Sequence, residues 1–290
     1  MQTIEANSQS KTLTEKQRLA LISLLADDDP VVYRLIRSKL LSYGSEAEKW
    51  LHAEILSSDP KLRRRAREIL EHRARQRADE AFLDYCGRHG EELDLEEASF
   101  LLARTRYPEI NCDAYTALLD SWASELQARL AKSFSPESKL DEFNRYLFGE
   151  LDFRGNEQYG HDPDSCYINQ IVDKRRGNPI GLCGVYLFLA RRIEMPIAGI
   201  GLPGHFICRY QSTKSEIYVD CYRQGALLTK ADCVKYLLQS SYGLVEGQLS
   251  PVSPRRMLQR MCRNLGTTYG HLEETEEAAR VLRYLETLTR

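Results

Sequence analysis

The sequence lacks the features that mark several specialised classes of protein. Its 290 residues hold 40 Lys and Arg against 42 Asp and Glu, so no large net charge draws the chain to nucleic acid or to an anionic membrane. No apolar stretch approaches the roughly 18 residues of a membrane span, and the polar N-terminus has no signal-peptide pattern. We therefore expect a cytoplasmic protein that binds neither nucleic acid nor a membrane.

The cysteines lack any CxxC pair. Eight are present, and most have apolar neighbours, which favours free buried thiols in a reducing compartment. This excludes a disulfide framework and a zinc knuckle, and we expect neither a metal nor a cofactor. What the composition does contain is 42% hydrophobic residues, enough for a substantial core.

The first third of the chain has a helical pattern. Residues 1–12 are polar and aperiodic, which predicts a disordered tail. Two Asp-Pro pairs, at 29–30 and 59–60, each begin a helix with Asp as the cap and Pro at the first position. This repeated helix start predicts a HEAT-like helical region over residues 13–90. The alternative is a set of ordinary helices that share a common type of cap.

A basic run over residues 61–77 has acidic residues interleaved at helical spacing. We interpret it as a solvated helix face with i,i+4 ion pairs rather than as a nucleic-acid patch.

The middle of the chain predicts an α+β domain, over residues 91–245. Helical periodicity is followed by ordered loops rich in Gly, Asn and Asp, between Leu151 and Asn178. An apolar helix is then expected from Leu182 to about Ile193, and after it come three strand candidates, IAGIGL, HFICRY and EIYVDCY. This order indicates a helix packed on a small antiparallel sheet. The pattern over residues 246–290 predicts a TPR-like helix pair.

Three residues form a candidate catalytic triad. Cys183 is expected in the first turn of the apolar helix, where free amides and the macrodipole lower the pKa of a thiol. His205 begins the second strand and Asp220 ends the third, so the carboxylate can orient the imidazole. Each residue also has an ordinary structural interpretation: a core cysteine, a structural histidine and a turn-capping aspartate.

Further polar groups could line the same cleft. The amide of Gly184 and the side chains of Asn169 and Asn178 are the candidates for binding substrate or an oxyanion. His161, in the loop region, is the competing candidate for the base.

Several segments, in order, resemble SirB-type proteins of the transglutaminase-like superfamily. They are DLEEASFLLARTRYPEI, FNRYLFGELDFRGN, DPDSCYINQIVDKRRGNPIGL, LARRIEMPIAGIGLPGHF and YVDCY, spread over residues 93–235. The tail is similar to the TPR-like segment that often follows this domain. The resemblance implies a papain-like or transglutaminase-like core in which Gly181-Leu182-Cys183, His205 and Asp220 match the triad positions. Residues 222–225 depart from the turn that relatives carry after the Asp.

Two functions follow as expectations. The first is a thiol acyl-transferase or hydrolase that attacks an amide or isopeptide bond through Cys183, His205 and Asp220. The second is a catalytically silent regulatory or protein-interaction module, because many SirB-type proteins carry another residue at the nucleophile position. Both imply a protein or peptide as partner or substrate, and the residues leave the oligomeric state open.

Overall fold

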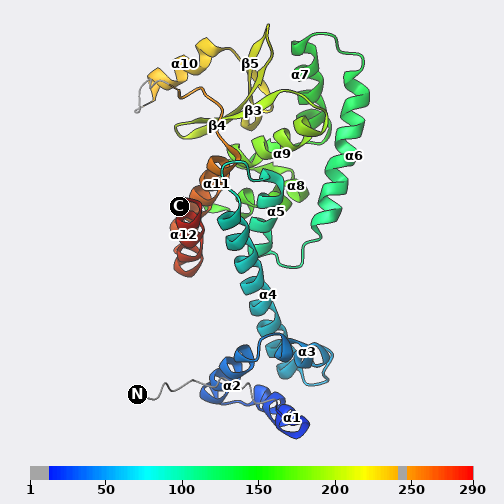
Figure 1. The fold of residues 1–290 in the computed structure, drawn as a ribbon, viewed down its shortest axis with the longest axis vertical. Coiled ribbons are helices and arrows are strands. Elements are labelled where there is room, and N and C mark those ends of the chain that lie inside the picture. The colour runs from blue at the N-terminus through cyan, green and yellow to red at the C-terminus, as the bar shows by residue number, and fades with distance from the viewer. Residues whose placement is uncertain (1–12, 241–246, 290) are drawn as a thin grey trace, which may run out of the picture. The chain divides into compact units, whose positions relative to one another are not determined.

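The chain divides into two compact units in its computed structural model, which describes residues 13–240 and 247–289 (Figure 1). The units are Met1–Arg77 and Ala78–Arg290, and the division falls within one long helix, α4 (Pro60–Arg88). The predicted disordered tail, residues 1–12, lies outside the described residues.

The N-terminal unit is built from short helices. They are α1 (Glu15–Ser23), the 3-10 turn η1 (Leu24–Ala26), α2 (Pro30–Ser42), α3 (Ser45–Glu54) and the first part of α4. Both predicted Asp-Pro starts are confirmed: Asp29 Oδ1 accepts from the amide of Val31 at 2.8 Å, and Asp59 Oδ1 accepts from that of Lys61 at 2.8 Å. Naming this unit HEAT-like stays a prediction.

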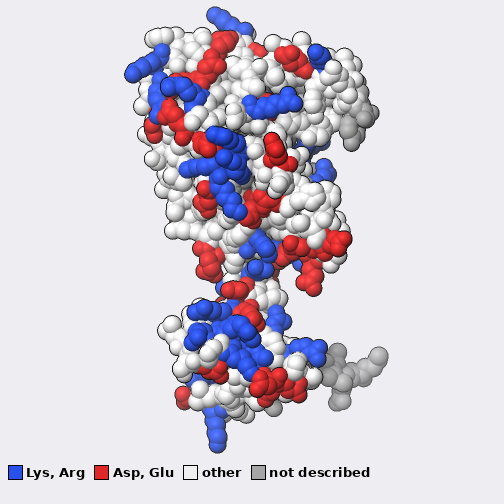
Figure 2. Space-filling model, turned by 180° about the vertical axis from the view of Figure 1, so that it is seen from behind, with Lys and Arg blue, Asp and Glu red and all other residues white. Residues whose placement is uncertain are grey.

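The basic run of this unit forms ion pairs with acidic residues, but few of them are the i,i+4 pairs along one helix that the sequence predicts. One i,i+4 pair forms, Arg64 with Glu68 at 3.7 Å. Arg73 and Arg77 instead both reach Glu48 on α3, Arg73 at 3.1 Å. On the face shown in Figure 2, Lys and Arg gather with Asp and Glu beside them. The run therefore links helices within the unit, which supports its interpretation as structural.

The second unit carries most of the helices. They are α5 (Leu95–Arg106), α6 (Cys112–Leu130), α7 (Pro136–Asn144), the π-helical η2 (Arg145–Glu150), α8 (Ile168–Lys174), α9 (Pro179–Arg192), α10 (Lys230–Gln239), α11 (Pro254–His271) and α12 (Thr275–Thr289). Short 3-10 segments η3 (Tyr159–His161), η4 (Pro163–Cys166) and η5 (Cys221–Arg223) lie between them, with a two-stranded parallel pair, β1 (Arg154–Gly155) and β2 (Arg176–Gly177).

A four-stranded antiparallel sheet completes this unit, in the order β3-β4-β5-β6. The strands are β3 (Ile197–Leu202), β4 (His205–Gln211), β5 (Glu216–Asp220) and β6 (Ala226–Leu228). The three predicted strands and the α+β class are confirmed. β6 was not predicted because three residues are too few to show an alternating pattern.

Alternation along β4 gives the sheet two buried faces. Phe206 and Cys208 belong to the large core that surrounds α9, whereas Ile207 belongs to a separate cluster with Leu237 of α10. Successive side chains of a strand point to opposite faces, so one short strand contributes to both clusters. In Figure 1, α9 runs across the sheet at the centre of the unit.

An ionic cluster fixes α9 to α5. Glu96 of α5 is 5% exposed and accepts hydrogen bonds from Arg191 at 2.8 Å and from Arg192 at 2.6 and 2.8 Å. These charge-assisted bonds satisfy a carboxylate that would otherwise be buried unpaired. The C-terminal end of α9 is therefore held in one position on α5.

Gly225 occupies a position that tolerates no side chain. Its φ is +77°, and an added Cβ would lie 2.4 Å from Cγ of Asn144. Asn144 cannot withdraw easily, since its Nδ2 donates to the Gly225 carbonyl at 2.7 Å and its Oδ1 accepts from the Tyr186 hydroxyl at 3.0 Å.

We expect Gly225→Ala to lower the free energy of unfolding by about 2–4 kcal/mol, through left-handed strain and overpacking. Urea unfolding followed by circular dichroism measures it. Gly87→Ala is the matched control, because an added Cβ meets nothing within 4 Å there. Equal unfolding midpoints for the two variants would contradict this account.

Candidate functional site

The structure brings His205 and Asp220 together. His205 is the first residue of β4, after a turn in which Gly204 has a φ of +69°, and Asp220 is the last residue of β5. Nε2 of the ring lies 2.9 Å from Oδ2 of the carboxylate. The two side chains are 16% and 3% exposed, so the pair is formed at the edge of the core with the ring toward the outside.

Backbone amides fix the orientation of Asp220. Its Oδ1 accepts from the amides of Tyr222 at 3.1 Å and Arg223 at 3.2 Å, which begin η5. A carboxylate held in this way accepts the Nε2 proton of the ring, and Nδ1 of the neutral ring is then an acceptor. Among the described residues, no hydrogen bond reaches this Nδ1.

A pocket of about 460 Å³ opens beside the His205 ring. The segment η3, the start of α9, the β3–β4 turn and α11 supply its walls. The lining residues are Glu157, Tyr159, Gly160, His161, Pro179, Ile180, Gly204, His205, Phe206, Arg260, Asn264, Thr267, Thr268 and His271. Cys183 does not line this pocket.

The helix that carries Cys183 begins earlier than predicted. Pro179 is its first residue and Asn178 is its cap, with Oδ1 accepting from the Gly181 amide at 2.8 Å. The predicted start at Leu182 is therefore wrong, and Cys183 is the fifth residue of the helix. At that depth its amide, like that of Gly184, donates to the carbonyl four residues earlier along the helix.

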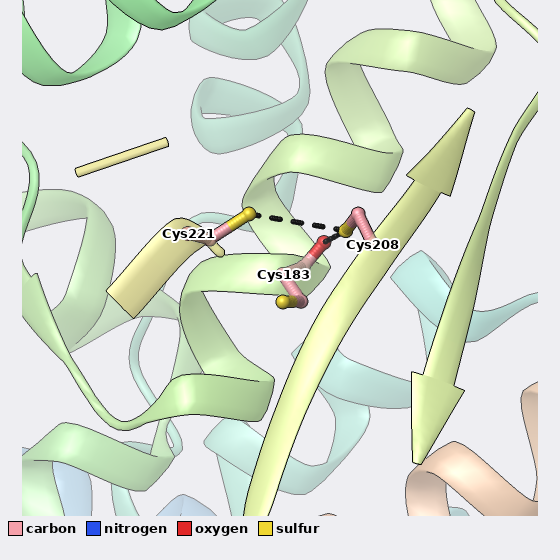
Figure 3. Close-up of side chains that lie close together, drawn as sticks. All are labelled: Cys183, Cys208 and Cys221. Atoms are coloured by element: carbon pink, nitrogen blue, oxygen red, sulfur yellow. Dashed lines mark hydrogen bonds between the residues drawn. The ribbon is translucent and has the colours of Figure 1, made fainter. Parts of the chain in front are cut away.

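Cys183 lies in a cluster of three buried thiols (Figure 3). Cys208 of β4 and Cys221 of η5 complete it, and the three sulfur atoms lie within 4.8 Å of one another. The Cys183 thiol donates to the carbonyl of Phe206 at 3.5 Å, and the Cys208 thiol to that of Cys183 at 3.9 Å. The Cys221 thiol points at the Cys208 sulfur, 3.8 Å away. Every thiol proton therefore has an acceptor.

Burial raises the pKa of the Cys183 thiol well above its ordinary value. The expectation that the helix start lowers this pKa is wrong, because Cys183 is 0% exposed and no cationic side chain is hydrogen-bonded to its sulfur among the described residues. No hydrogen bond joins it to the His205 ring either, although both residues are described. The structure thus assembles two members of the predicted triad and keeps the third in the core.

Among the described residues, these three thiols are also the group of potential ligand atoms that lie close enough together to hold a metal ion. Thiolate, not thiol, is the metal ligand, and burial raises the pKa of Cys183 and of Cys221, although, against the effect of burial, hydrogen bonds with these two thiols lower the pKa of Cys208 to about 6. Asp220 nearby opposes further negative charge. We therefore interpret the cluster as packing within the core.

The two asparagines predicted to bind substrate or an oxyanion are buried away from the His205 pocket. Asn178 caps α9 and donates from Nδ2 to the Cys166 sulfur at 3.1 Å. Asn169 of α8 is 1% exposed, and its Oδ1 has no hydrogen-bond partner among the described residues. Neither side chain lines the His205 pocket. Their roles in binding substrate or an oxyanion stay predictions.

The sequence did not indicate that α11 forms a wall of the pocket, to which it contributes Arg260 and His271 among other residues. Both lie in the helical tail, which has an amphipathic pattern and no motif. His161, the competing candidate for the base, does line the pocket, and its ring stacks on that of His271 with centroids 5.3 Å apart. No sequence signal joins these residues, because 110 positions separate the two histidines and only the fold brings them together.

No helix in the described residues is long and apolar enough to cross a membrane. A cytoplasmic location stays a prediction.

Comparison with known proteins identifies relatives of this domain. Residues 113–263, about half of the chain, match the model of the transglutaminase-like superfamily. The UPF0162 protein of Xylella fastidiosa (strain 9a5c) is 30% identical over 196 residues, which cover 66% of this chain and 70% of that protein. Protein SirB1 of Salmonella typhimurium is 22% identical over 135 residues, 47% of each chain.

A eukaryotic protein is also similar to this chain. F-box only protein 21 of Homo sapiens is 29% identical over 152 residues, which cover 50% of this chain and 24% of that protein. No solved structure matches the chain.

Proposed function

Because the chain belongs to the transglutaminase-like superfamily, in its SirB-type branch, we propose that it is a protein-interaction or regulatory module built on a transglutaminase-like scaffold. In this proposal Cys183 is a core residue and the His205 pocket receives a protein or peptide partner. The scaffold keeps the His205–Asp220 pair, which now shapes a binding pocket.

One observation carries the proposal: Cys183 has no exposed surface, and its thiol donates to the Phe206 carbonyl. A nucleophile needs an accessible thiolate within hydrogen-bond reach of its base. At the start of α9, the residues that line the His205 pocket are Pro179 and Ile180, and neither carries a thiol. The residues that line the pocket therefore include a carboxylate-oriented imidazole but no thiol.

The second candidate is the thiol acyl-transferase or hydrolase. The intact His205–Asp220 pair favours it, since a carboxylate-oriented imidazole is what thiol activation needs. It requires Cys183 to leave the thiol cluster and reach the pocket. The two candidates therefore differ in the reactivity of a single thiol.

Alkylation of the folded protein separates them. Seven of the eight thiols are buried and Cys112 is partly exposed. With iodoacetamide at pH 7 and at pH 9, we expect Cys112 to be labelled first and Cys183 to be labelled only after unfolding in urea. The raised pKa of Cys183 keeps it protonated at both pH values, so the higher pH does not speed its labelling.

Mass spectrometry of the digested protein reports each site, and Cys262, also fully buried, is the matched control for protection. Selective labelling of Cys183 in the folded chain, lost in His205→Ala, would establish the thiol enzyme and refute the interaction module.

A further inference from the structure

Arg260 is a cation in the pocket without an acid to pair with. Its Nη2 donates to the carbonyls of Leu202 at 2.7 Å and His205 at 2.8 Å, and the guanidinium stacks over the Phe206 ring, 5.5 Å from its centroid. Among the described residues, no carboxylate lies within ion-pair distance of it. Nε and Nη1 also have no hydrogen-bond partner there, so three N–H groups remain for a ligand.

Arg260 has fewer compensating groups than three other arginines of the unit that are buried or half-buried. Arg192 and Arg280 are paired with acids, and Arg255, which is buried without an acid partner among the described residues, is compensated by four backbone carbonyls. Burial of Arg260 lowers its pKa, which reflects a charge that the protein itself only partly compensates. An anionic group that entered the pocket would complete its coordination.

The rest of the pocket adds an acceptor beside this donor. Arg260 donates to the backbone carbonyl of His205, and both residues line the pocket. The guanidinium and the His205 ring therefore lie in the same part of its wall. Nδ1 of that ring, with Nε2 held by Asp220, is free to accept an N–H group. Glu157, the single acid of the lining, is exposed. Among the lining residues Arg260 is thus the one formal cation, and the Nδ1 acceptor of His205 lies in the same wall.

A peptide C-terminus has the matching groups, a carboxylate and a backbone N–H a few atoms apart. We propose that the pocket binds the C-terminal carboxylate of a protein or peptide, with Arg260 on the carboxylate and Nδ1 of His205 on the last N–H group. A monoanion fits one arginine better than a phosphate dianion does. The volume of about 460 Å³ suits the last residues of a chain. This inference rests on the proposed function, of which it names the partner chemistry.

Histidine-ring NMR of the full chain tests the proposal. Three of the six histidines line the pocket, His161, His205 and His271, whereas His52, His72 and His89 do not and serve as internal controls. The probes are N-acetyl-Ala-Ala-Ala with a free carboxylate, the same peptide as its C-terminal amide, N-acetyl-Ala-Glu-Ala amide, and inorganic phosphate.

We expect the free-carboxylate peptide to shift the ring signals of the three pocket histidines and to leave the three controls unchanged. Its apparent Kd is expected to be at least tenfold lower than that of the matched amide, because the amide presents no charge to Arg260. The Glu peptide and phosphate are expected to bind at least tenfold more weakly as well.

Variants of α11 assign the effect to Arg260. Arg260→Gln is expected to abolish the preference for the carboxylate over the amide, and Arg260→Lys to retain part of it. Arg263→Gln, an exposed neighbour on the same helix, is the matched control and should bind as the unmodified chain does. If Arg260→Gln does not fold, the comparison of the carboxylate and amide peptides on the unmodified chain still shows whether the pocket prefers a C-terminal carboxylate.

Equal binding of the carboxylate and amide peptides, or no binding by either, would overturn the inference. A stronger response to the Glu peptide would assign the pocket to acidic side chains, and one to phosphate alone would assign it to phosphate; both reject a C-terminus. None of these results alters the alkylation of Cys183, so failure here is distinguishable from failure of the proposed function.

Discussion

A cysteine introduced by Pro179→Cys is expected to react with iodoacetamide at least about tenfold faster than Cys112 does at pH 7. Pro179 is the first residue of α9 and is buried, but it lies in the wall of the pocket beside His205, so a small reagent that enters the pocket reaches this position. A thiol at that position gains the positive end of the helix macrodipole and an imidazole nearby, both of which lower a thiol pKa toward about 7. A shift from about 8.5 to 7 raises the thiolate fraction at pH 7 more than tenfold.

The same variant with His205→Gln separates the contributions of the helix and the ring. We expect it to lose most of the acceleration and to keep the smaller helix contribution. Cys183→Ser, made beside Pro179→Cys, is expected to leave the rate unchanged, since Cys183 faces the Phe206 carbonyl. A rate for Pro179→Cys no higher than that of Cys112 would show that the start of α9 does not face the His205 ring.

Arg255→Met is expected to lower the free energy of unfolding by at least about 3 kcal/mol. The side chain is 9% exposed and donates to four backbone carbonyls: Cys86 and His89 at the end of α4, and Thr287 and Leu288 at the end of α12. The carbonyl end of a helix carries partial negative charge, so two helix ends compensate one cation. Methionine fills the space but removes the side-chain donor from three of these carbonyls, and among the described residues only Leu288 keeps another, Gln259 Nε2 at 2.6 Å.

Arg256→Met is the matched control, because that neighbouring side chain is exposed and its loss should cost less than about 0.5 kcal/mol. Chemical denaturation of both variants gives the comparison. Similar stabilities would mean that water replaces the four hydrogen bonds at little cost, and that α11 is held by its apolar face alone.

Local patterns predicted much of the fold. The alternation in HFICRY gave β4, and the Asp-Pro pairs gave the starts of α2 and α4, because both signals depend only on neighbouring residues. Asn178-Pro179 is the same kind of helix start, a capping side chain followed by proline. Because it follows a loop rich in Gly and Asn, the sequence pattern places these two residues in the loop. The pattern therefore predicts a helix that begins at Leu182, three residues after its actual start.

That difference moved Cys183 from the first turn to the core. The burial of its sulfur depends on Cys208 and Cys221, which come from a strand and a 3-10 turn that are distant in sequence. Position on a helix predicts the reactivity of a thiol only when the exposed face of that helix is known. The pairing of His205 with Asp220 was within reach of the sequence, because two adjacent strands and a short turn determine it.

The participation of α11 in the pocket has a practical consequence for dissecting the chain. The superfamily match ends at residue 263, but the pocket wall continues to His271, and Arg255 binds the last turn of α12. A fragment trimmed to the matched residues would lose one of the pocket histidines and both α12 acceptors of Arg255. Recombinant fragments intended to retain ligand binding therefore need to run through Thr289.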